Sequence, residues 1–343
     1  MPTKEEQRAS LDQYMDGFYA CYVIDTGTQA GLFKTLAPEQ QGLTVEEIAT
    51  RLGLHANYVR VWCQTAYHFG LLDWHDERYS LAPHMDDLLA NPEDPAFFSP
   101  HVALSRHSHF LETHAAFMKT GQVDHTHHTH EPARTEMMAR TAERVRGPLF
   151  LSSVLPNLDG AGRSFQEGGR LLDVGCGSGM FIAKLAESLP RCHFSGVDIS
   201  QSDIDYGRTR IKDKGLGDRV QIEVSSAESI SFADEFDAVT MVIVFHELEA
   251  KEAAVANCFR ALKPGGQFIV IDPDYPNNVP DFRNPSFKAG IMDQYFEMTW
   301  GHVHLIRPET EALLSRAGFR EPLWHHPAVG RGLYWMVARK PPA

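Results

Sequence analysis

The sequence predicts an α/β fold in which a doubly wound, mostly parallel sheet follows a smaller, mostly α-helical domain. From residue 170 onward, short apolar runs alternate with amphipathic helical stretches, which is typical of a sheet with helices on both faces. A glycine-rich turn at residues 175–179 directly follows the first of these apolar runs. The chain has 343 residues and is 43% apolar, which is sufficient for two domains.

The glycine-rich turn indicates a binding site for an adenosine cofactor. It joins a predicted strand at 171–174 to a predicted helix with the sequence MFIAKLAESLP. Glycine is needed there because the backbone bends sharply and approaches a ligand that a Cβ would displace. Asp198 ends the next apolar run, 23 residues after Gly175. An acid at that distance can accept hydrogen bonds from both ribose hydroxyls of the cofactor.

The glycine spacing distinguishes between adenosine cofactors. Dinucleotide-binding folds carry G-x-G-x-x-G, but this chain has G-x-G-x-G, with Asp173 in the strand before it. The resulting D-x-G-x-G-x-G stretch resembles the first motif of the class I S-adenosylmethionine-dependent methyltransferases. The resemblance implies a Rossmann-like, seven-stranded methyltransferase sheet and S-adenosyl-L-methionine as the cofactor. In that family the loop passes the methionine part of the cofactor, and the acid after the second strand holds the ribose.

Later segments support the same resemblance. A helix, K-P-G-G and the strand QFIVIDPD form the usual late signature of the family. The family often has an acid after the third strand, VQIEV, that contacts the adenine amine. This chain has Ser226 there, so the adenine contacts are assigned to Ala227 or Glu228. The predicted cofactor-binding residues are Asp173, Gly175, Gly177, Gly179, Asp198, Ile199, Ala227, Glu228 and Val244.

His246 is the first candidate catalytic residue. Ligands of such sheets bind beyond the carboxyl ends of the strands, and His246 follows the predicted fourth strand at 236–245. In related O-methyltransferases a histidine in the pocket often acts as a base, although the usual tryptophan-flanked context is absent here. The alternative is that the imidazole of His246 caps the helix that starts near Glu249.

The segment TWGHVHLIRPE is the second candidate site. We assign His302 a catalytic role there, and Tyr295 and Arg307 roles in substrate binding. Arginine can form two hydrogen bonds with a carboxylate, and tyrosine can line an apolar wall. The alternative is that Arg307 pairs with a surface acid and the histidines, His304 included, fill a loop.

The N-terminal half predicts a winged-helix pattern. It contains a helix at 10–34, a T-x-x-E capping box at Thr44, a helix at 57–69 and the hairpin LLDWHDERYSL. The pattern resembles the dimerisation domain fused to many small-molecule methyltransferases. We therefore predict a dimerisation domain at 1–98, a helical bridge at 99–155 that contributes to the substrate cavity, and a methyltransferase domain at 156–343. The bridge contains DHTHHTH, with histidines at 125, 127, 128 and 130, which we interpret as a solvated connector.

Charge and cysteine content exclude several classes of function. The net charge is −13, and residues 1–100 carry six basic and fifteen acidic side chains, which disfavours binding to nucleic acid or membranes. The five cysteines are dispersed without a C-x-x-C pair, and the N-terminus has no apolar signal region, so we predict a cytoplasmic protein. A metal-dependent transfer would need carboxylates clustered around the acceptor. The sequence does not require this, and no metal ligand is assigned.

The predicted activity is methyl transfer from S-adenosylmethionine to oxygen or sulfur of a small molecule, with nitrogen left open. The reaction is a direct displacement at the sulfonium methyl, so the enzyme must mainly align donor and acceptor and exclude water. The predicted assembly is a homodimer. Two alternatives remain: an S-methyltransferase for a small carboxylated thiol or thioether, and a cofactor-sensing winged-helix regulator without catalysis.

Overall fold

The computed structural model describes residues 2–94, 96–102, 108–124, 132–158, 160–326 and 332–342. The chain divides into two compact units, Met1–Glu112 and Thr113–Ala343. Each unit contains its own cluster of buried apolar side chains. The predicted domain limits at 98 and 155 stay predictions, and the histidines at 125, 127, 128 and 130 lie outside the described residues.

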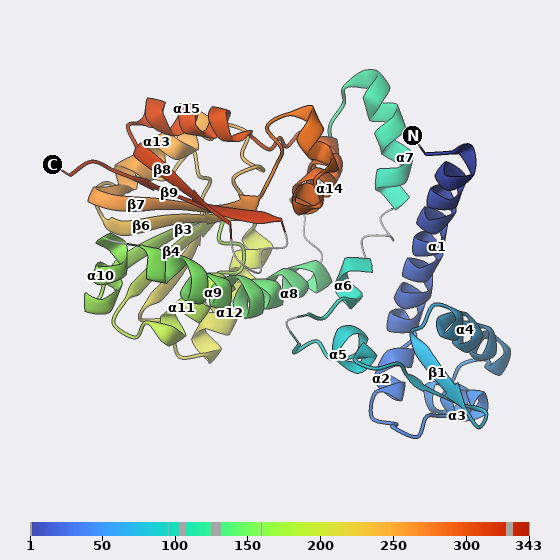
Figure 1. The fold of residues 1–343 in the computed structure, drawn as a ribbon. Coiled ribbons are helices and arrows are strands. Elements are labelled where there is room, and N and C mark those ends of the chain that lie inside the picture. Colours follow the sequence, from blue (N-terminus) through green and yellow to red (C-terminus); the bar gives the residue numbers. More distant parts are fainter. Residues whose placement is uncertain are drawn as a thin grey trace. The chain divides into compact units, whose positions relative to one another are not determined.

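The first unit is a helical domain with one hairpin. Its elements are α1 (Lys4–Gln29), α2 (Leu32–Leu36), α3 (Val45–Leu52), α4 (Ala56–His68), β1 (Leu72–His75), β2 (Arg78–Leu81), α5 (Met85–Leu89) and α6 (Ser99–Val102), as Figure 1 shows. The predicted capping box is present, since Thr44 and Glu47 exchange hydrogen bonds between side chain and backbone. None of the helices in the described part of the chain has the length and apolar composition that crossing a membrane demands.

The predicted first helix was wrong at both ends. The prediction placed one helix at 10–34, but α1 begins at Lys4 and α2 is a separate helix. Thr3 and Glu6 form a second capping box that starts α1 earlier. Gly31 has a φ of 75°, in the left-handed region, and this conformation separates the two helices.

The second unit contains a seven-stranded sheet with the order β5-β4-β3-β6-β7-β9-β8. The strands are β3 (Arg170–Val174), β4 (His193–Asp198), β5 (Val220–Val224), β6 (Phe236–Val242), β7 (Leu262–Pro273), β8 (Arg320–His325) and β9 (Leu333–Arg339). Strands β3 to β7 are parallel, and β9 is antiparallel to both of its neighbours. The predicted doubly wound sheet is therefore confirmed, with one antiparallel strand near its edge.

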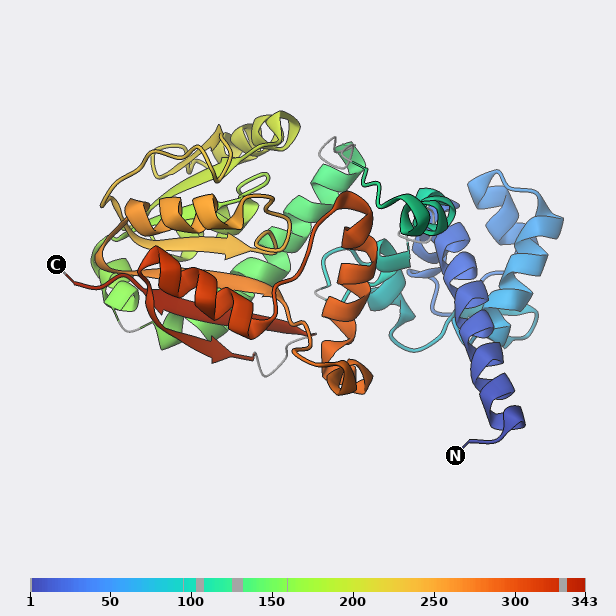
Figure 2. The ribbon, with the colours of Figure 1, turned by 90° about the horizontal axis from the view of Figure 1, so that it is seen from above.

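Helices cover both faces of this sheet. The helices of the second unit are α8 (Pro132–Thr141), α9 (Gly147–Leu149), α10 (Gly160–Glu167), α11 (Met180–Ser188), α12 (Gln201–Asp213), α13 (Lys251–Ala261), α14 (Lys288–Glu297) and α15 (Arg307–Ala317), and α7 (Ser108–Thr120) spans the division between the units. Of these, α14 lies beyond the ends of the strands and not over a face (Figures 1 and 2). One buried cluster joins Leu171 to α10, α11 and α12, and another joins Leu172 to α13 and α15. Figures 1 and 2 show α13 and α15 lying over one face of the strands. Leu171 and Leu172 are consecutive in β3 and pack on opposite faces of the sheet, so this strand is buried on both sides.

The chain leaves the central strand β6 through a strained residue. The prediction extended this strand to residue 245, but β6 ends at Val242 and Ile243 has a φ of 57°. A β-branched side chain is disfavoured in this left-handed region. The Ile243 amide still bonds to the Ile271 carbonyl of β7, at 2.7 Å. Residues 244–248 therefore turn across the carboxyl ends of the strands, where the candidate site lies.

Candidate active site

The glycine-rich loop connects β3 to α11 and has the conformation of a ligand cradle. Gly175, Gly177 and Gly179 have φ values of 76°, 52° and 70°. A Cβ on Gly175 would lie 2.4 Å from Val244 Cγ2, because the loop packs directly against the segment that follows β6. The backbone needs glycine at residue 175 for two separate reasons, its φ and this contact.

Asp198 ends β4 and faces the same loop. Its Oδ2 accepts a hydrogen bond from the Gly177 amide at 2.7 Å, and its Oδ1 accepts one from the Ser200 amide at 2.9 Å. The two backbone donors fix the orientation of the carboxylate at the edge of the loop. The neighbouring Ile199 is 50% exposed and offers an apolar surface beside it. This arrangement fits the polar ribose and the flat adenine of an adenosine cofactor.

Asp173 lies inside β3, beneath the loop. It is buried, and Thr240 Oγ1 donates a hydrogen bond to its Oδ1 at 2.7 Å. Burial raises the pKa of Asp173 to about 7, and the hydrogen bond from Thr240 only partly opposes this. The carboxyl group therefore takes up a proton on folding throughout mildly acidic pH.

The raised pKa of Asp173 predicts a pH-dependent stability. Between pH 4 and 7 the folded protein holds a proton that the unfolded chain, with an ordinary pKa of 3.8, has released. The contribution of Asp173 to the free energy of unfolding therefore falls as pH rises through this window, by up to about 1.4 kcal/mol per pH unit. Urea unfolding of the wild type and Asp173→Asn at several pH values, without cofactor, should show their stability difference changing in this direction. A pH-independent difference would contradict the prediction.

The predicted adenine contacts lie after β5. The side-chain amide of Asn257, on α13, donates to the carbonyl oxygens of Ala227 at 3.0 Å and Glu228 at 2.8 Å. This bidentate contact holds the turn that the sequence assigned to adenine. Val244 lies on the other side of the glycine-rich loop, against Gly175. All nine predicted cofactor residues thus lie at the carboxyl ends of β3 to β6 or in the turns that follow them.

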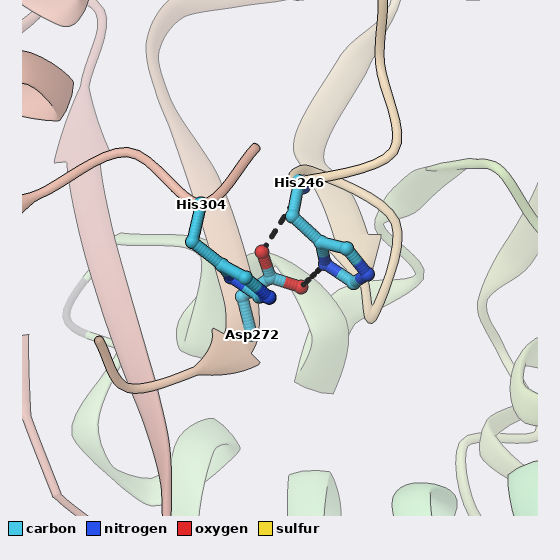
Figure 3. A group of neighbouring side chains, drawn as sticks. All are labelled: His246, Asp272 and His304. Carbon is cyan, nitrogen blue, oxygen red and sulfur yellow. Dashed lines mark hydrogen bonds and ion pairs between the residues drawn. The ribbon is translucent and has the colours of Figure 1, made fainter. Parts of the chain in front are cut away.

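Five titratable side chains gather at the carboxyl ends of β6 and β7. We call them the histidine–carboxylate cluster: His246, Asp272, Asp293, Glu297 and His304. His246 is 2% exposed, and its Nδ1 lies 2.9 Å from Asp272 Oδ1, while its backbone amide donates to Asp272 Oδ2 at 3.1 Å (Figure 3). The alternative in which His246 caps the following helix is wrong, because α13 begins at Lys251 without a side-chain cap.

Helix α14 and the segment after it supply the rest of the cluster. His304 Nε2 lies 2.8 Å from Asp293 Oδ2, and its ring stacks on that of His246 with centroids 4.4 Å apart. His302 Nδ1 lies 2.5 Å from Glu297 Oε2. The buried amide of Gln294 accepts from the His304 backbone and donates to the His302 carbonyl, at 2.6 and 3.0 Å. Gln294 therefore fixes the register of residues 302–304 against α14.

The electrostatics of His246 follow from its neighbours. Burial alone would lower the pKa of His246, but the charge and hydrogen bond of Asp272, with Glu247 and Asp293, raise it to about 10. Its Nε2 lies 3.6 Å from Asp293 Oδ2 and 3.8 Å from Glu247 Oε1. Both ring nitrogens of His246 thus face carboxylate oxygens, and the site favours a positive charge at this position.

Two predicted substrate residues lie away from the cluster. Tyr295 is 52% exposed, stacks on His114 and accepts a hydrogen bond from it through its backbone carbonyl, so it faces α7. Arg307 forms an ion pair with Glu311 at 2.9 Å and lies over the ring of Trp324. This contact agrees with the alternative interpretation, in which Arg307 pairs with a surface acid.

Sequence reasoning missed Asp293, Glu297 and Arg146. Asp293 and Glu297 are four residues apart, which places both on one face of α14, and this spacing before H-x-H was an available signal. Arg146 ends the π-helical turn η3 (Ala142–Arg146). Burial lowers the pKa of Arg146, and the charges of Glu247, Asp173, Asp272 and Asp293 oppose that shift. The charge of Arg146 therefore acts both on Asp173, beneath the glycine-rich loop, and on the carboxylates of the cluster.

Comparisons with known proteins agree with this geometry. A model of the methyltransferase domain matches residues 171–266, and a model of the O-methyltransferase dimerisation domain matches residues 12–91. The ubiquinone/menaquinone biosynthesis C-methyltransferase UbiE of Ectopseudomonas mendocina is 35% identical over 178 residues, 48% of this chain and 70% of that protein. The chain belongs to the S-adenosylmethionine-dependent methyltransferases. Its predicted alternative as a regulator without catalysis is not retained.

Further relatives of this methyltransferase match in sequence or in fold. The demethylmenaquinone methyltransferase of Bacteroides fragilis is 29% identical, over 32% of this chain and 46% of that protein. The chain spans less than half the length of several such curated relatives. The mitomycin 7-O-methyltransferase MmcR has a TM-score of 0.78 at 19% identity and covers 97% of this chain and 98% of its own. Human N-acetylserotonin methyltransferase, solved with S-adenosylmethionine, has a TM-score of 0.74 at 18% identity, with coverages of 99% and 100%.

S-adenosyl-L-methionine is the cofactor of this methyltransferase. The described residues fit it, since the loop leaves no room for a Cβ at Gly175 and Asp198 presents a carboxylate fixed by two backbone amides. When bound, the cofactor supplies an electrophilic methyl group on a sulfonium.

Proposed function

We propose that this methyltransferase transfers the methyl group to an oxygen atom of a small molecule. The observation that carries the proposal is the adjacency of two sites: Val244 packs on Gly175 of the cofactor loop, and His246 follows two residues later. A methyl acceptor held by the histidine–carboxylate cluster would therefore lie next to the cofactor's methionine end. The match to the O-methyltransferase dimerisation domain and the fold shared with MmcR support oxygen as the acceptor atom.

Different residues of the chain would position the cofactor and the methyl acceptor. Asp198 would hold the ribose, with Ile199 against the adenine and the turn at Ala227 and Glu228 at its edge. Arg146 would pair with the carboxylate of the cofactor's methionine part, since its charge acts on Asp173 directly beneath the loop. His246 would contact the acceptor, and the acceptor's proton would pass to a carboxylate of the cluster, because His246 itself favours its protonated form. His302, bonded to Glu297, would position that helix face and not contact the reacting atoms.

A carbon acceptor is the second candidate, because the curated relatives include C-methyltransferases. The thiol or thioether alternative has lost its main support. It relied on Arg307 and the histidines to hold an anion, and on the absence of an unambiguous base; of these, the Arg307 guanidinium is engaged by Glu311. Nitrogen has no specific observation in its favour.

Methyl-labelled cofactor distinguishes these acceptors. The purified protein would be incubated with S-adenosylmethionine carrying a ¹³C-methyl group and with phenols, carboxylic acids and thiols. Carbon NMR of the products separates O-methyl, C-methyl and S-methyl groups. His246→Ala should retain cofactor binding by calorimetry but lose transfer, while His325→Ala, which alters a histidine stacked on Trp335, should retain both. A labelled C-methyl product would replace the oxygen proposal with the second candidate.

We also propose that α1 forms the centre of a homodimer. Leu11, Tyr14, Phe18 and Tyr22 are 43% to 71% exposed and recur at helical spacing, so they form one apolar stripe. A second copy of this chain is the proposed occupant, because the dimerisation-domain match at residues 12–91 covers the stripe from Tyr14 onward.

A charge in the stripe should disrupt the homodimer. Phe18→Asp would place a carboxylate in an apolar contact, and we expect a monomer at micromolar concentration by size-exclusion chromatography with light scattering. Gln13→Asp is the matched control, since at 100° per residue Gln13 lies on the opposite face of α1. Dimers of both variants would show that the stripe is not the interface.

A further inference from the structure

The histidine–carboxylate cluster has the composition of a metal site. Two overlapping groups within it bring one ligand atom per residue to within 4.8 Å of one another: His246, Asp272 and His304, and His246, Asp293 and Glu297. Two imidazoles with carboxylates suit zinc and the divalent ions of manganese, iron and cobalt. Two ligand atoms about 2.1 Å from one ion are themselves roughly 3.0–3.4 Å apart, so small side-chain movements would suffice.

Three elements hold the first group in place. His246 comes from the turn after β6, Asp272 from β7 and His304 from the segment that Gln294 anchors to α14. All three residues are at least nine-tenths buried. The ring of His304 stacks between those of His246 and Tyr275. Figure 3 shows the three side chains next to one another, with His246 joined to the carboxylate of Asp272. Ligands fixed in this way need little ordering when an ion binds.

The charges around the cluster also favour a cation. Four carboxylates belong to the site: Asp272, Asp293, Glu297 and the adjacent Glu247. Among the described cations, Arg146 and Lys251 act on these carboxylates through their charges, and the four carboxylates outnumber them. Both ring nitrogens of His246 also face carboxylate oxygens, so a cation bound in place of its proton would be stabilised. A divalent ion would add positive charge to this acidic site.

We propose that His246, Asp272 and His304 bind one divalent transition-metal ion, with Asp293 as a further oxygen donor. The next step rests on the proposed function: the acceptor's oxygen would complete the coordination of the ion. The ion would then lower the pKa of that oxygen and fix it beside the cofactor. In the transfer, the O–CH3 bond would form as the sulfonium S–CH3 bond breaks, with the electron pair staying on the sulfur of S-adenosylhomocysteine. The acceptor's proton would pass to Glu297, the cluster carboxylate that is not a proposed ligand, and no oxidation state would change.

Metal content tests the site independently of catalysis. The full-length protein would be stripped with a chelator, loaded with Zn²⁺, Mn²⁺ or Co²⁺, desalted and measured by mass spectrometry of the bound metal. We expect about one ion per chain for the wild type. His304→Ala and Asp272→Asn each alter a proposed ligand, so each should weaken binding by at least the roughly 10-fold to 100-fold that losing a ligand's hydrogen-bond partner costs. The Co²⁺ visible spectrum should show imidazole ligation that is lost in His304→Ala.

Two controls separate this site from other histidines. His326→Ala removes an exposed histidine paired with Asp274 at 3.3 Å in the same unit, and it should leave the stoichiometry unchanged. Replacing the histidines at 125, 127, 128 and 130 by asparagine should leave it unchanged as well. Circular dichroism confirms that each variant is folded. If metal binding follows either control and not His304→Ala, the proposed site is wrong.

Cofactor binding keeps the two proposals distinguishable. The stripped protein should still bind S-adenosylmethionine by calorimetry, because none of the predicted cofactor residues is a metal ligand. Methyl transfer by the stripped protein at the full rate would overturn the metal inference and leave the proposed function standing. Metal binding at the cluster without transfer to any acceptor would support the metal site and contradict the proposed function.

Discussion

Asp198→Ala should weaken binding of S-adenosylmethionine about 100-fold or more. A carboxylate that accepts hydrogen bonds from both ribose hydroxyls contributes about 1.5–3 kcal/mol for each, and the substitution removes both. It also leaves the amides of Gly177 and Ser200 without their acceptor, which loosens the loop itself. Isothermal titration calorimetry on the purified protein measures the change directly.

The product of the cofactor provides an internal check on this result. S-adenosylhomocysteine carries the same ribose, so its affinity should fall by a similar factor in Asp198→Ala. Asp205→Ala is the matched control, because this acid is 61% exposed on the following helix α12 and pairs only loosely with Arg208, at 3.7 Å. Affinities of Asp198→Ala within about threefold of the wild type would contradict the ribose assignment.

The cofactor half of the site could be predicted because its determinants are local in the sequence. The glycines, the strand before them and Asp198 belong to one βαβ unit, and the backbone of such a unit fixes where each residue lies. Gly175 and Asp198 therefore reach the same loop in the structure. Ile199 and Val244 also lie near the glycine-rich loop, since each follows the carboxyl end of a central strand.

The acceptor half could be predicted only in part because it is assembled from distant segments. His246 could be proposed as a candidate because it follows a strand, but the face that α14 turns toward it depends on tertiary packing. That packing selects Asp293 and Glu297 and turns Tyr295 toward His114. Arg307 had a more local partner, Glu311, one helical turn away. For Tyr295 and Arg307, the residue type indicated which contacts the side chain could make, but the sequence did not show which residue it would contact.

Gly175→Ala should destabilise the second unit and weaken cofactor binding together. An alanine at a φ of 76° costs about 1–2 kcal/mol, since its Cβ approaches the following carbonyl. The new methyl group would also lie 2.4 Å from Val244 Cγ2, and overpacking of this kind costs about 1–3 kcal/mol more. We expect the free energy of unfolding to fall by about 2–5 kcal/mol. Urea denaturation monitored by circular dichroism provides the measurement.

The two contributions can be separated by a second substitution. Val244→Ala removes the two methyl groups that Gly175→Ala would strike, at 2.4 and 2.9 Å, but keeps the Cβ of residue 244 at 2.9 Å. The double variant should therefore recover part of the overpacking cost and retain the cost of the backbone conformation. Gly217→Ala is the control, because a Cβ there meets no atom within 4 Å. If the double variant is no more stable than Gly175→Ala alone, the loop does not rest on Val244. The link that brings the turn before His246 against the cofactor loop would then be lost, and with it the main argument that donor and acceptor bind side by side.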